Sequence, residues 1–262
     1  YQNENLNKNI SQYEMLKNYE ISKLDIQKLN DYCKKHKIKF LASCFDVDSL
    51  KLYSSLNNDT VKIPSGEINN LHLIEYAAKK FKKLIISTGM SYLSEVQDAL
   101  MEVAKCGNPN VILMQCTSSY PCPPETMNIK AIDTMKQAFN DLPVGISDHV
   151  IGDMVSLGAV ARGADIIEKH FTLDKEMEGP DHILSMLPEE FSNMRERVRI
   201  VEKSLGDGIK QPSSSEIASV IRFRKTMYAK NDIKKGTVIN ENDIIYTAPA
   251  YGIYAKYEDI VL

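Results

Sequence analysis

The sequence has no tryptophan and only five cysteines among its 262 residues. The cysteines form no Cys-x-x-Cys pair and no spacing typical of a zinc site, so a structural zinc centre is not expected. An odd number of scattered thiols is typical of reduced cysteines, which predicts a cytoplasmic location. No apolar run reaches about 18 residues and no signal peptide is visible, so no membrane partner is expected. The cysteines are Cys33, Cys44, Cys106, Cys116 and Cys122.

The sequence also lacks a strong excess of charge of either sign. Its formal net charge is −3, with 26% charged and 43% hydrophobic residues. This composition is typical of a soluble globular protein with a large core. The mild acidity disfavours a nucleic-acid partner, which a basic face would hold.

Short apolar runs rich in β-branched residues recur at intervals of roughly 20–35 residues, the size of one βα unit. An amphipathic stretch with helical period follows each run. This alternation predicts a parallel sheet whose strands are buried on both faces. The runs are residues 38–43, 60–63, 84–87, 111–116, 144–147 and 165–169. The amphipathic stretches are residues 47–56, 71–81, 94–106, 129–139, 154–162 and 188–205, with a further helix expected over 24–37.

Two architectures of the α/β class fit this pattern. An open, doubly wound sheet holds six strands, whereas a (β/α)8 TIM barrel needs eight, of which two would be missing from the front of this chain. Residues 1–23 are polar, rich in Asn and without an expected strand. This long polar start favours a barrel that lacks its first strands.

The composition changes after the last expected helix. Residues 206–216 are rich in Gly and Ser and are typical of a linker. Beyond them, residues 227–230, 232–238 and 243–246 are expected to form short strands and turns. We expect a first domain over residues 1–210, a linker over 211–219 and a small β-rich domain over 220–262 that stops without a closing element.

Hydroxyl side chains follow most of the expected strands, at the point where each strand ends. In a parallel α/β protein, the carboxyl ends of the strands form the functional face. Several hydroxyls on one face, with the cation of Lys62 among them, predict a pocket for an anion such as phosphate or carboxylate. The hydroxyls belong to Ser43, Ser65, Ser87, Ser118, Tyr120 and Ser147.

Two histidines, His149 and His170, close adjacent expected strands. Neighbouring strands lie about 4.8 Å apart, so both imidazoles reach one ion. Two histidine ligands leave most positions to water or substrate, which is typical of a catalytic divalent metal such as Mn²⁺. The alternative is a pair of hydrogen-bonded histidines without a metal, and the spacing alone favours neither.

Two carboxylates lie near the same face. Glu67 follows a glycine at a strand end and is a candidate general acid/base or hydroxyl anchor. Taken alone, it fits a carboxylate at the start of the next helix better. Asp181 lies in a long loop after His170, where it either turns back over the site or belongs to an ordinary Gly-Pro-Asp turn.

These candidate residues lie in six motifs that follow one another along the chain. The motifs are Lys62-Ile-Pro-Ser-Gly-Glu67, Ser87-Thr-Gly-Met90, Cys116-Thr-Ser-Ser-Tyr-Pro121, Gly145-Ile-Ser-Asp-His149, Glu168-Lys-His-Phe171 and Gly179-Pro-Asp-His182. In order and spacing they resemble the sialic acid synthase family over essentially the whole chain. The segment Lys230-Asn-Asp-Ile-Lys-Lys-Gly236 is similar to the start of that family's antifreeze-like (SAF) domain.

The resemblance implies a (β/α)8 barrel followed by a SAF domain. It also implies that the enzyme condenses phosphoenolpyruvate with an N-acylated hexosamine, such as N-acetylmannosamine, to give a nonulosonic (sialic) acid and phosphate. The family is commonly a domain-swapped homodimer, which we expect here. The enol carbon attacks the sugar aldehyde, water adds to the resulting cationic carbon, and phosphate leaves by C–O cleavage.

The resemblance also assigns roles to the candidate residues. His149 and His170 match the family's ligands for Mn²⁺ or Mg²⁺, and with Glu67, our candidate for proton transfer, they form the expected catalytic set. The sugar contacts are Asn7, Glu67, Tyr120 and Asp181. The residues expected to bind phosphoenolpyruvate are Ser43, Lys62, Ser65, Ser87, Ser118, Tyr120 and Ser147.

Several departures from the family pattern leave the acceptor sugar open. The family's first strand and a Lys-x-Gln motif have no counterpart, and Ser118 stands where some members have Asn. The SAF arginine that reaches the partner subunit's sugar site is missing from Thr247-Ala-Pro-Ala250. The acceptor could be N-acetylmannosamine, a diacetamido-trideoxyhexose on a legionaminate- or pseudaminate-type route, or a spore-coat precursor.

Two competing functions fit parts of the same pattern. The first is a different phosphoenolpyruvate aldol synthase, which would lack a SAF domain, so the segment over residues 230–236 disfavours it. The second is a non-catalytic sugar-binding barrel, which would have no need of the hydroxyl series and of both histidines.

Overall fold

The computed structural model describes residues 11–107 and 110–262. Contacts between residues divide the chain into two compact units, Tyr1–Leu205 and Gly206–Leu262. No helix among the described residues has the length and apolar character needed to cross a membrane.

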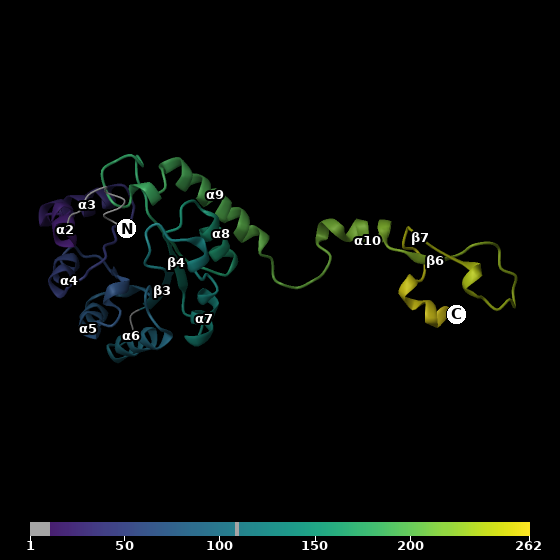
Figure 1. The fold of residues 1–262 in the computed structure, drawn as a ribbon. Helices are drawn as coiled ribbons and strands as arrows, with labels where there is room; N and C mark the ends of the chain where they lie inside the picture. The colour runs from purple at the N-terminus through teal and green to yellow at the C-terminus, as the bar shows by residue number, and fades with distance from the viewer. Residues whose placement is uncertain (1–10, 108–109) are drawn as a thin grey trace. The chain divides into compact units, whose positions relative to one another are not determined.

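The first unit is built on a curled parallel sheet of five strands (Figure 1). In space the strands follow one another in the same order as in the sequence. A doubly wound sheet reverses its strand order at a switch point, whereas a barrel does not. The sequential order therefore excludes the open doubly wound alternative and leaves half of a barrel wall. The strands are β1 (Thr60–Ile63), β2 (Lys83–Ser87), β3 (Asn110–Cys116), β4 (Val144–Asp148) and β5 (Ile167–Lys169).

Helices lie on the outer side of this sheet (Figure 1), and each begins or ends within a few residues of the position predicted from the sequence. Short polar side chains accept hydrogen bonds at their starts, as with Asp46 and Asn70, which bond backbone N–H groups of the first turn. The helices are α3 (Lys23–Lys35), α4 (Val47–Ser54), α5 (Leu71–Lys80), α6 (Leu93–Lys105), α7 (Ala131–Ala138), α8 (Met154–Ala161) and α9 (Pro188–Ser204).

Alternate residues of the strands supply two separate apolar layers. Outward-facing residues such as Leu84, Leu113 and Ile146 are fully buried in the main core against the helices. Inward-facing Ile85 and Ile112 form a smaller cluster with Met114. Because side chains alternate between the two faces of a strand, the next inward positions toward the carboxyl ends carry the candidate site.

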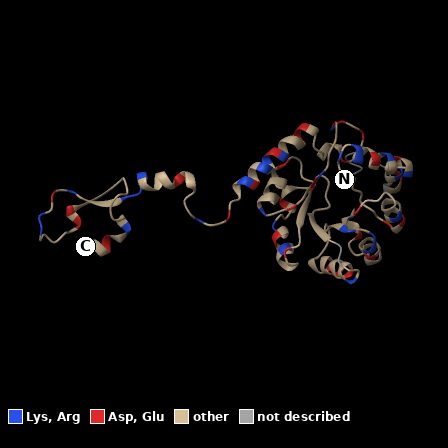
Figure 2. Ribbon diagram, turned by 180° about the vertical axis from the view of Figure 1, so that it is seen from behind, with Lys and Arg blue, Asp and Glu red and all other residues tan. Residues whose placement is uncertain are grey.

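The outer surfaces of the helices carry charges of both signs. Lys and Arg alternate with Asp and Glu along α9 and over the neighbouring helices (Figure 2). A nucleic-acid-binding face instead gathers basic residues in one stripe or patch.

Two predictions about the start of the chain are wrong. Residues 38–43 form no strand: only an isolated parallel bridge joins Ser43 to Lys62, through two backbone hydrogen bonds of 3.1 Å. The run pairs only with β1 among the described residues, and Ile38 is 65% exposed, so it lacks the burial that its apolar character predicted. Within residues 1–23, helix α2 (Gln12–Asn18) replaces part of the expected loop. A capping box between Ser11 and Glu14 starts it, and this Ser-x-x-Glu signal was readable in the sequence.

The second unit contains a two-stranded antiparallel sheet and short helices. Strands β6 (Thr226–Ala229) and β7 (Ile244–Thr247) pair with each other and match two of the segments expected to be strands. Between them, Gly236 has φ +92° in a turn. Helices α10 (Ile217–Phe223) and α11 (Glu258–Val261) complete the unit, so it is less purely β than the sequence suggested.

At Gly145, in β4, the backbone of the next segment and a core side chain pack directly against the glycine. This contact leads to a stability prediction. A Cβ at this position would lie 2.7 Å from both the Ile166 carbonyl oxygen and the Met114 sulfur. We expect Gly145→Ala to lower the free energy of unfolding by about 2–3 kcal/mol, because a strand and a core side chain must move apart. The urea denaturation midpoint measures this loss.

Gly66→Ala is the matched control for Gly145→Ala. A Cβ at Gly66 would meet no described heavy atom within 4 Å. We expect its stability to stay equal or to rise slightly, since alanine restricts the unfolded chain. Equal midpoints for the two variants would contradict the packing argument.

Candidate active site

The carboxyl ends of the strands carry a polar layer above the apolar inner cluster. Cys116, Ser147 and Glu168 are direct partners in the register of β3, β4 and β5. Lys62, from β1 at the other edge of the sheet, forms an ion pair with the Glu168 carboxylate. The Ser147 hydroxyl donates to Glu168 Oε1 at 2.7 Å. The curl of the sheet thus joins residues of its first, fourth and fifth strands in one network.

His149 lies directly beyond β4, with only 4% of its surface exposed. Its Nδ1 is 2.8 Å from the Thr117 carbonyl oxygen, which only accepts, so Nδ1 is assigned the proton. In the neutral ring, Nε2 then carries a lone pair. Ser147 Oγ is 3.3 Å from Nε2 but gives its single proton to Glu168. This arrangement leaves Nε2 available as a ligand atom.

His170 packs against His149 through an edge-to-face contact, with ring centroids 5.3 Å apart. The Tyr120 ring stacks on His149 at 4.0 Å and meets His170 edge-on at 5.7 Å. His170 Nδ1 also lies 3.7 Å from Asp181 Oδ2. The two histidines that the sequence placed on adjacent strands therefore lie together, with Tyr120 and Asp181 beside them.

Burial holds both imidazoles in their neutral form. It lowers the pKa of His149, and a smaller contribution comes from the neighbouring His170. Burial likewise lowers the pKa of His170, against the opposing effect of Asp181. Neutral imidazole is the form that binds metal ions, so the site needs no proton loss at neutral pH.

The lowered histidine pKa values predict a pH-dependent stability for the metal-free protein. The folded state binds fewer protons than the unfolded state between the folded pKa and the unfolded value of about 6.5. Stability is therefore complete above about pH 6.5 and is lost as the pH falls through the folded pKa, by about 1.4 kcal/mol for each unit of lowering. Urea unfolding of the EDTA-treated protein from about pH 7.5 to about pH 5 measures this slope.

A double His149→Gln/His170→Gln variant is the control for that slope. Burial acts to raise the pKa of Glu168, but the Lys62 ion pair and the Ser147 hydrogen bond outweigh it, so this pKa lies below its ordinary value of 4.5. An unchanged slope in the double variant would assign the pH dependence to groups other than the two imidazoles.

The donor set fits an open divalent-metal site. Within the described part of the chain, no group of three or more His, Cys, Asp or Glu side chains is arranged to hold a metal. Two histidines would therefore leave the remaining positions to oxygen ligands from water or substrate, which suits Mn²⁺ or Mg²⁺. A buried polar atom supports this: Asp181 Oδ1, beside His170, has no hydrogen-bond partner among the described residues.

The serine hydroxyls form a second cluster around Gly89. The Gly89 N–H donates to Ser65 Oγ at 3.0 Å. A Cβ on Gly89 would lie 2.5 Å from Ser118 Oγ and 2.8 Å from Ser65 Oγ, so a larger residue would push the two hydroxyls from their present positions. Ser87 Oγ is buried and has no partner in the described residues. An unpaired buried hydroxyl indicates a group that a ligand satisfies.

Two predicted site residues, Ser43 and Glu67, stand apart from these contacts. Ser43 reaches the site by its backbone bridge to Lys62. Glu67 lies in a short 3-10 turn, where its carboxylate accepts from Asn70 Nδ2 at 2.8 Å, at the start of α5. This contact agrees with the interpretation of Glu67 as a carboxylate at the start of the next helix. Asn7 lies outside the described residues.

Glu168 is a site residue that the sequence reasoning missed, although it begins one of the six motifs. It stands two residues before His170, so the alternation of a strand places both on the inner face. A carboxylate at an inward position of a buried parallel strand needs a partner, and Lys62 supplies it. Strand alternation counted back from His170 would have identified it.

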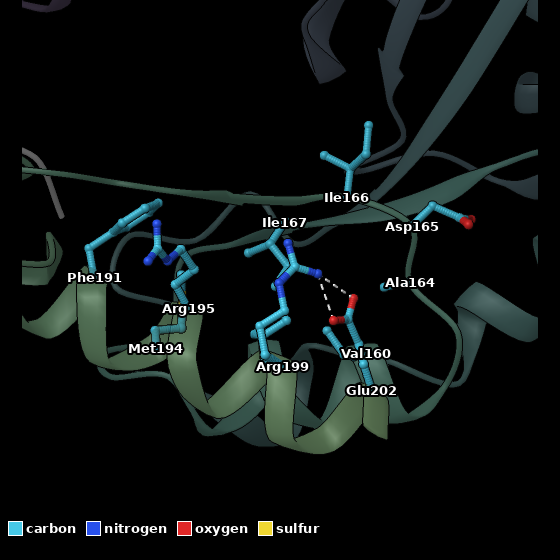
Figure 3. A pocket seen from close by; sticks show the side chains of 11 residues that line it. Val160, Ala164, Asp165, Ile166, Ile167, Phe191, Met194, Arg195, Arg199 and Glu202 are labelled. Carbon is cyan, nitrogen blue, oxygen red and sulfur yellow. Dashed lines mark hydrogen bonds and ion pairs between the residues drawn. The ribbon is translucent and has the colours of Figure 1, made fainter. Parts of the chain in front are cut away.

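The pocket beside α9 is separate from this site. Figure 3 shows it between α9 and the β5 segment, with Ile167 and Met194 in its wall. Its volume is about 200 Å³. Its Arg199 is paired with Glu202 of the same helix. A different pocket, of about 360 Å³, opens next to the histidines and is lined by His170, Asp181 and residues of α2.

Known proteins match the chain over most of its length. Residues 1–210 match the NeuB family. The N,N'-diacetyllegionaminic acid synthase of Campylobacter jejuni is 43% identical over 254 residues, covering 96% of this chain and 76% of that protein. The human N-acetylneuraminate-9-phosphate synthase is 36% identical over 220 residues, covering 84% of this chain and 61% of that protein.

A solved structure agrees with the fold. The crystal structure of the N-acetylneuraminic acid synthetase of Leptospira borgpetersenii aligns with a TM-score of 0.75 and 34% identity, covering 84% of this chain and 76% of that one. The family match, these identities and the shared fold lead to one conclusion: the chain belongs to the NeuB family of sialic acid synthases.

Proposed function

We propose that the protein condenses phosphoenolpyruvate with an N-acylated hexosamine-type aldehyde to give a nonulosonic acid and inorganic phosphate. The observation that carries this proposal is the convergence of two neutral imidazoles and a Lys–Glu–Ser network at one end of a half-barrel. The network would form an anion site beside the proposed metal site, an arrangement that suits this reaction.

The anion end of the site is built from Lys62 and the serine hydroxyls. Phosphoenolpyruvate carries a phosphate and a carboxylate, and fixed donors hold such groups without reorganisation. Ser87 Oγ is a buried hydroxyl without a partner among the described residues, and the Ser65 and Ser118 hydroxyls lie close together around Gly89. Lys62 already faces Glu168, so bound substrate would share its cation with that carboxylate.

The metal end is built from His149 and His170. A bound Mn²⁺ or Mg²⁺ would supply Lewis acidity toward the aldehyde oxygen of the open-chain sugar. The Thr117 carbonyl holds His149 in the tautomer that leaves the Nε2 lone pair free to bind a metal. The stacked Tyr120 ring keeps the two imidazoles from turning away.

The reaction balances without a redox partner. The enol carbon of phosphoenolpyruvate forms a C–C bond with the aldehyde carbon. Water adds to the resulting cationic carbon, and phosphate leaves with the C–O bonding pair. The site residues therefore act mainly by positioning and by charge stabilisation, together with one proton transfer at the enol or aldehyde.

Glu67 is our candidate for that proton transfer. We expect Glu67→Gln to lower kcat about a hundredfold, because general acid–base catalysis contributes roughly that much or more. Asn70→Ala, which removes the hydrogen-bond donor to the Glu67 carboxylate, serves as the control for the helix-start role. A Glu67→Gln enzyme with near-normal turnover would remove Glu67 from catalysis.

The acceptor sugar is the least constrained part of the proposal. Relatives named for legionaminic and pseudaminic acid favour a diacetamido-trideoxyhexose, whereas others are named for N-acetylneuraminate 9-phosphate or for spore-coat polysaccharide. Asp181 and the pocket beside His170 are the groups that would contact the sugar.

The assembly is also proposed from the family resemblance. We propose that residues 220–262 form a SAF domain and that the protein is a cytoplasmic, domain-swapped homodimer. Sedimentation of the full-length protein would measure the dimer, and a monomer at micromolar concentration would contradict it.

Phosphate release from phosphoenolpyruvate tests the activity. EDTA-stripped full-length protein receives Mn²⁺ with either N-acetylmannosamine or a diacetamido-trideoxyhexose. Metal-dependent release with one sugar is the expected result and identifies the acceptor. A folded protein that binds both substrates and releases no phosphate would instead support a sugar-binding barrel without catalysis.

A further inference from the structure

A buried ion pair lies behind the two histidines, on the helix side of the sheet. Lys169 Nζ is 3.1 Å from Asp148 Oδ2, and the two side chains are 1% and 0% exposed. Asp148 directly precedes His149, and Lys169 directly precedes His170. Because side chains alternate along a strand, the pair joins the back of β4 to the back of β5 where the imidazoles leave the front.

The same pair holds both polar backbone groups of Val150, the residue after His149. The Val150 N–H donates to Asp148 Oδ1 at 2.9 Å. The Val150 carbonyl accepts a hydrogen bond from Lys169 Nζ. The chain that leaves His149 is therefore fixed by one residue on its own strand and by one on the neighbouring strand.

Further bonds tie the pair to the helix layer and fix the front of His149. Ser156, on α8, donates to Asp148 Oδ2 at 2.6 Å. The His149 carbonyl accepts from Cys122 N at 3.0 Å. His149 is thus bonded directly to Thr117 and Cys122, and the residue that follows it is held by the ion pair.

The energetics of a buried ion pair favour a geometric role over a stabilising one. Desolvation of two charges consumes most of their attraction, and an apolar pair of similar volume is often as stable or more so. Hydrogen bonds to fixed backbone groups, by contrast, set position. We therefore expect the main effect of this pair to be on the position of the Val150 backbone and of the histidine before it.

We propose that Lys169 and Asp148 are positioning residues that fix the relative placement of His149 and His170 and thereby set the affinity of the site for a divalent metal. The proposal rests on the proposed function in one respect, namely that the two imidazoles bind a metal. Mutation of residues that support metal ligands commonly weakens metal affinity by about 10–100-fold.

Metal affinity and stability, measured on the same variants, test the proposal. Mn²⁺ alone is titrated into EDTA-treated full-length protein and free Mn²⁺ is followed by its EPR signal. We expect Lys169→Met to raise the Kd for Mn²⁺ about 10–100-fold and to lower stability, since it leaves the Asp148 carboxylate buried and unpaired.

The double variant Lys169→Met/Asp148→Leu separates positioning from stability. It replaces both charges by apolar groups, so we expect stability to recover most of the loss. A positioning role predicts that the Kd stays raised about tenfold or more, because the hydrogen bonds that Asp148 and Lys169 make with the Val150 backbone are still missing. Recovery of the wild-type Kd together with stability would overturn the proposal.

Two further variants keep the test decisive. Arg197→Met breaks another ion pair, in which Arg197 Nη1 lies 3.0 Å from Asp153 Oδ2, and we expect a stability loss with an unchanged Kd. Ser156→Ala removes one bond to Asp148 and is the mild substitution if Lys169→Met does not fold. For Ser156→Ala we expect a Kd raised a few fold, and an unchanged Kd would again count against positioning.

A readout without metal distinguishes this proposal from the proposed function. The ¹⁵N resonances of the histidine ring nitrogens report whether His149 keeps its single Nδ1–H tautomer. We expect the wild-type and Arg197→Met proteins to keep it and the double variant to lose it. If the wild-type protein shows one tautomer but binds no Mn²⁺, the proposed function fails; if all the variants keep the tautomer, the positioning role fails.

Discussion

Alanine in place of His149 or His170 is expected to remove tight Mn²⁺ binding and to lower kcat/KM about a thousandfold. Lewis-acid assistance is worth several kcal/mol, and about 4 kcal/mol corresponds to that factor. In the proposed metal site each histidine would supply one of two nitrogen ligands, since the described residues contain no larger ligand cluster. Mn²⁺ titration and phosphate release measure the two effects on the same samples.

His72→Ala is the matched control for the histidine substitutions. His72 lies on α5 with its side chain 78% exposed, 4.0 Å from the Glu75 carboxylate. We expect its metal affinity and turnover to equal those of the wild-type protein. A His149→Ala enzyme that keeps both properties would show that the imidazoles pack against each other without holding a metal.

The repeating units of the fold were predictable because each carries its own local signal. Strand β1 has the predicted bounds, and α5 begins at the predicted Leu71, with Asn70 as its cap. Hydrophobic period and capping act over a few residues, so they are readable without the rest of the chain. Strand order is different, because it depends on how distant units pack, and the structure was needed to exclude the open sheet.

The predictions that were wrong or incomplete also concern contacts between distant parts of the chain. Residues 38–43 carry a strand-like sequence, but a strand also needs partners, and β1 supplies only a bridge. In the site, strand ends predicted that His149 and His170 would lie together. The ion pair between Lys62 and Glu168 joins residues 106 positions apart, which no local pattern reveals.

Breaking the Lys62–Glu168 pair should affect both activity and stability. We expect Lys62→Met to lower kcat/KM about a thousandfold, since it removes the cation nearest the proposed phosphoenolpyruvate site. Removing one partner of a buried pair costs about 3–5 kcal/mol. Lys62 is 13% exposed but Glu168 is 36% exposed, so water partly compensates and about 2–3 kcal/mol is expected here.

A double-mutant cycle isolates the pair from its surroundings. Lys62→Met, Glu168→Gln and the double variant are compared by urea denaturation, and we expect the double variant to lose less than the sum of the singles by about 1–2 kcal/mol. Additive losses would mean that the two charges do not interact in solution. Lys105→Met, which breaks an ion pair with Glu102 on the outer face of α6, is the control and should stay within about 0.5 kcal/mol of wild type.

The same variants can also be compared with and without phosphate. In Glu168→Gln the Lys62 cation has lost its carboxylate, so an anion has more to gain by binding there. We therefore expect millimolar phosphate to raise the unfolding midpoint of Glu168→Gln more than that of the wild-type protein, and to leave Lys62→Met unaffected. Equal responses of all three proteins would mean that phosphate binds elsewhere and that Lys62 is not part of the anion site. The expected order would show that Glu168 holds the Lys62 ammonium group in place until the substrate binds to it.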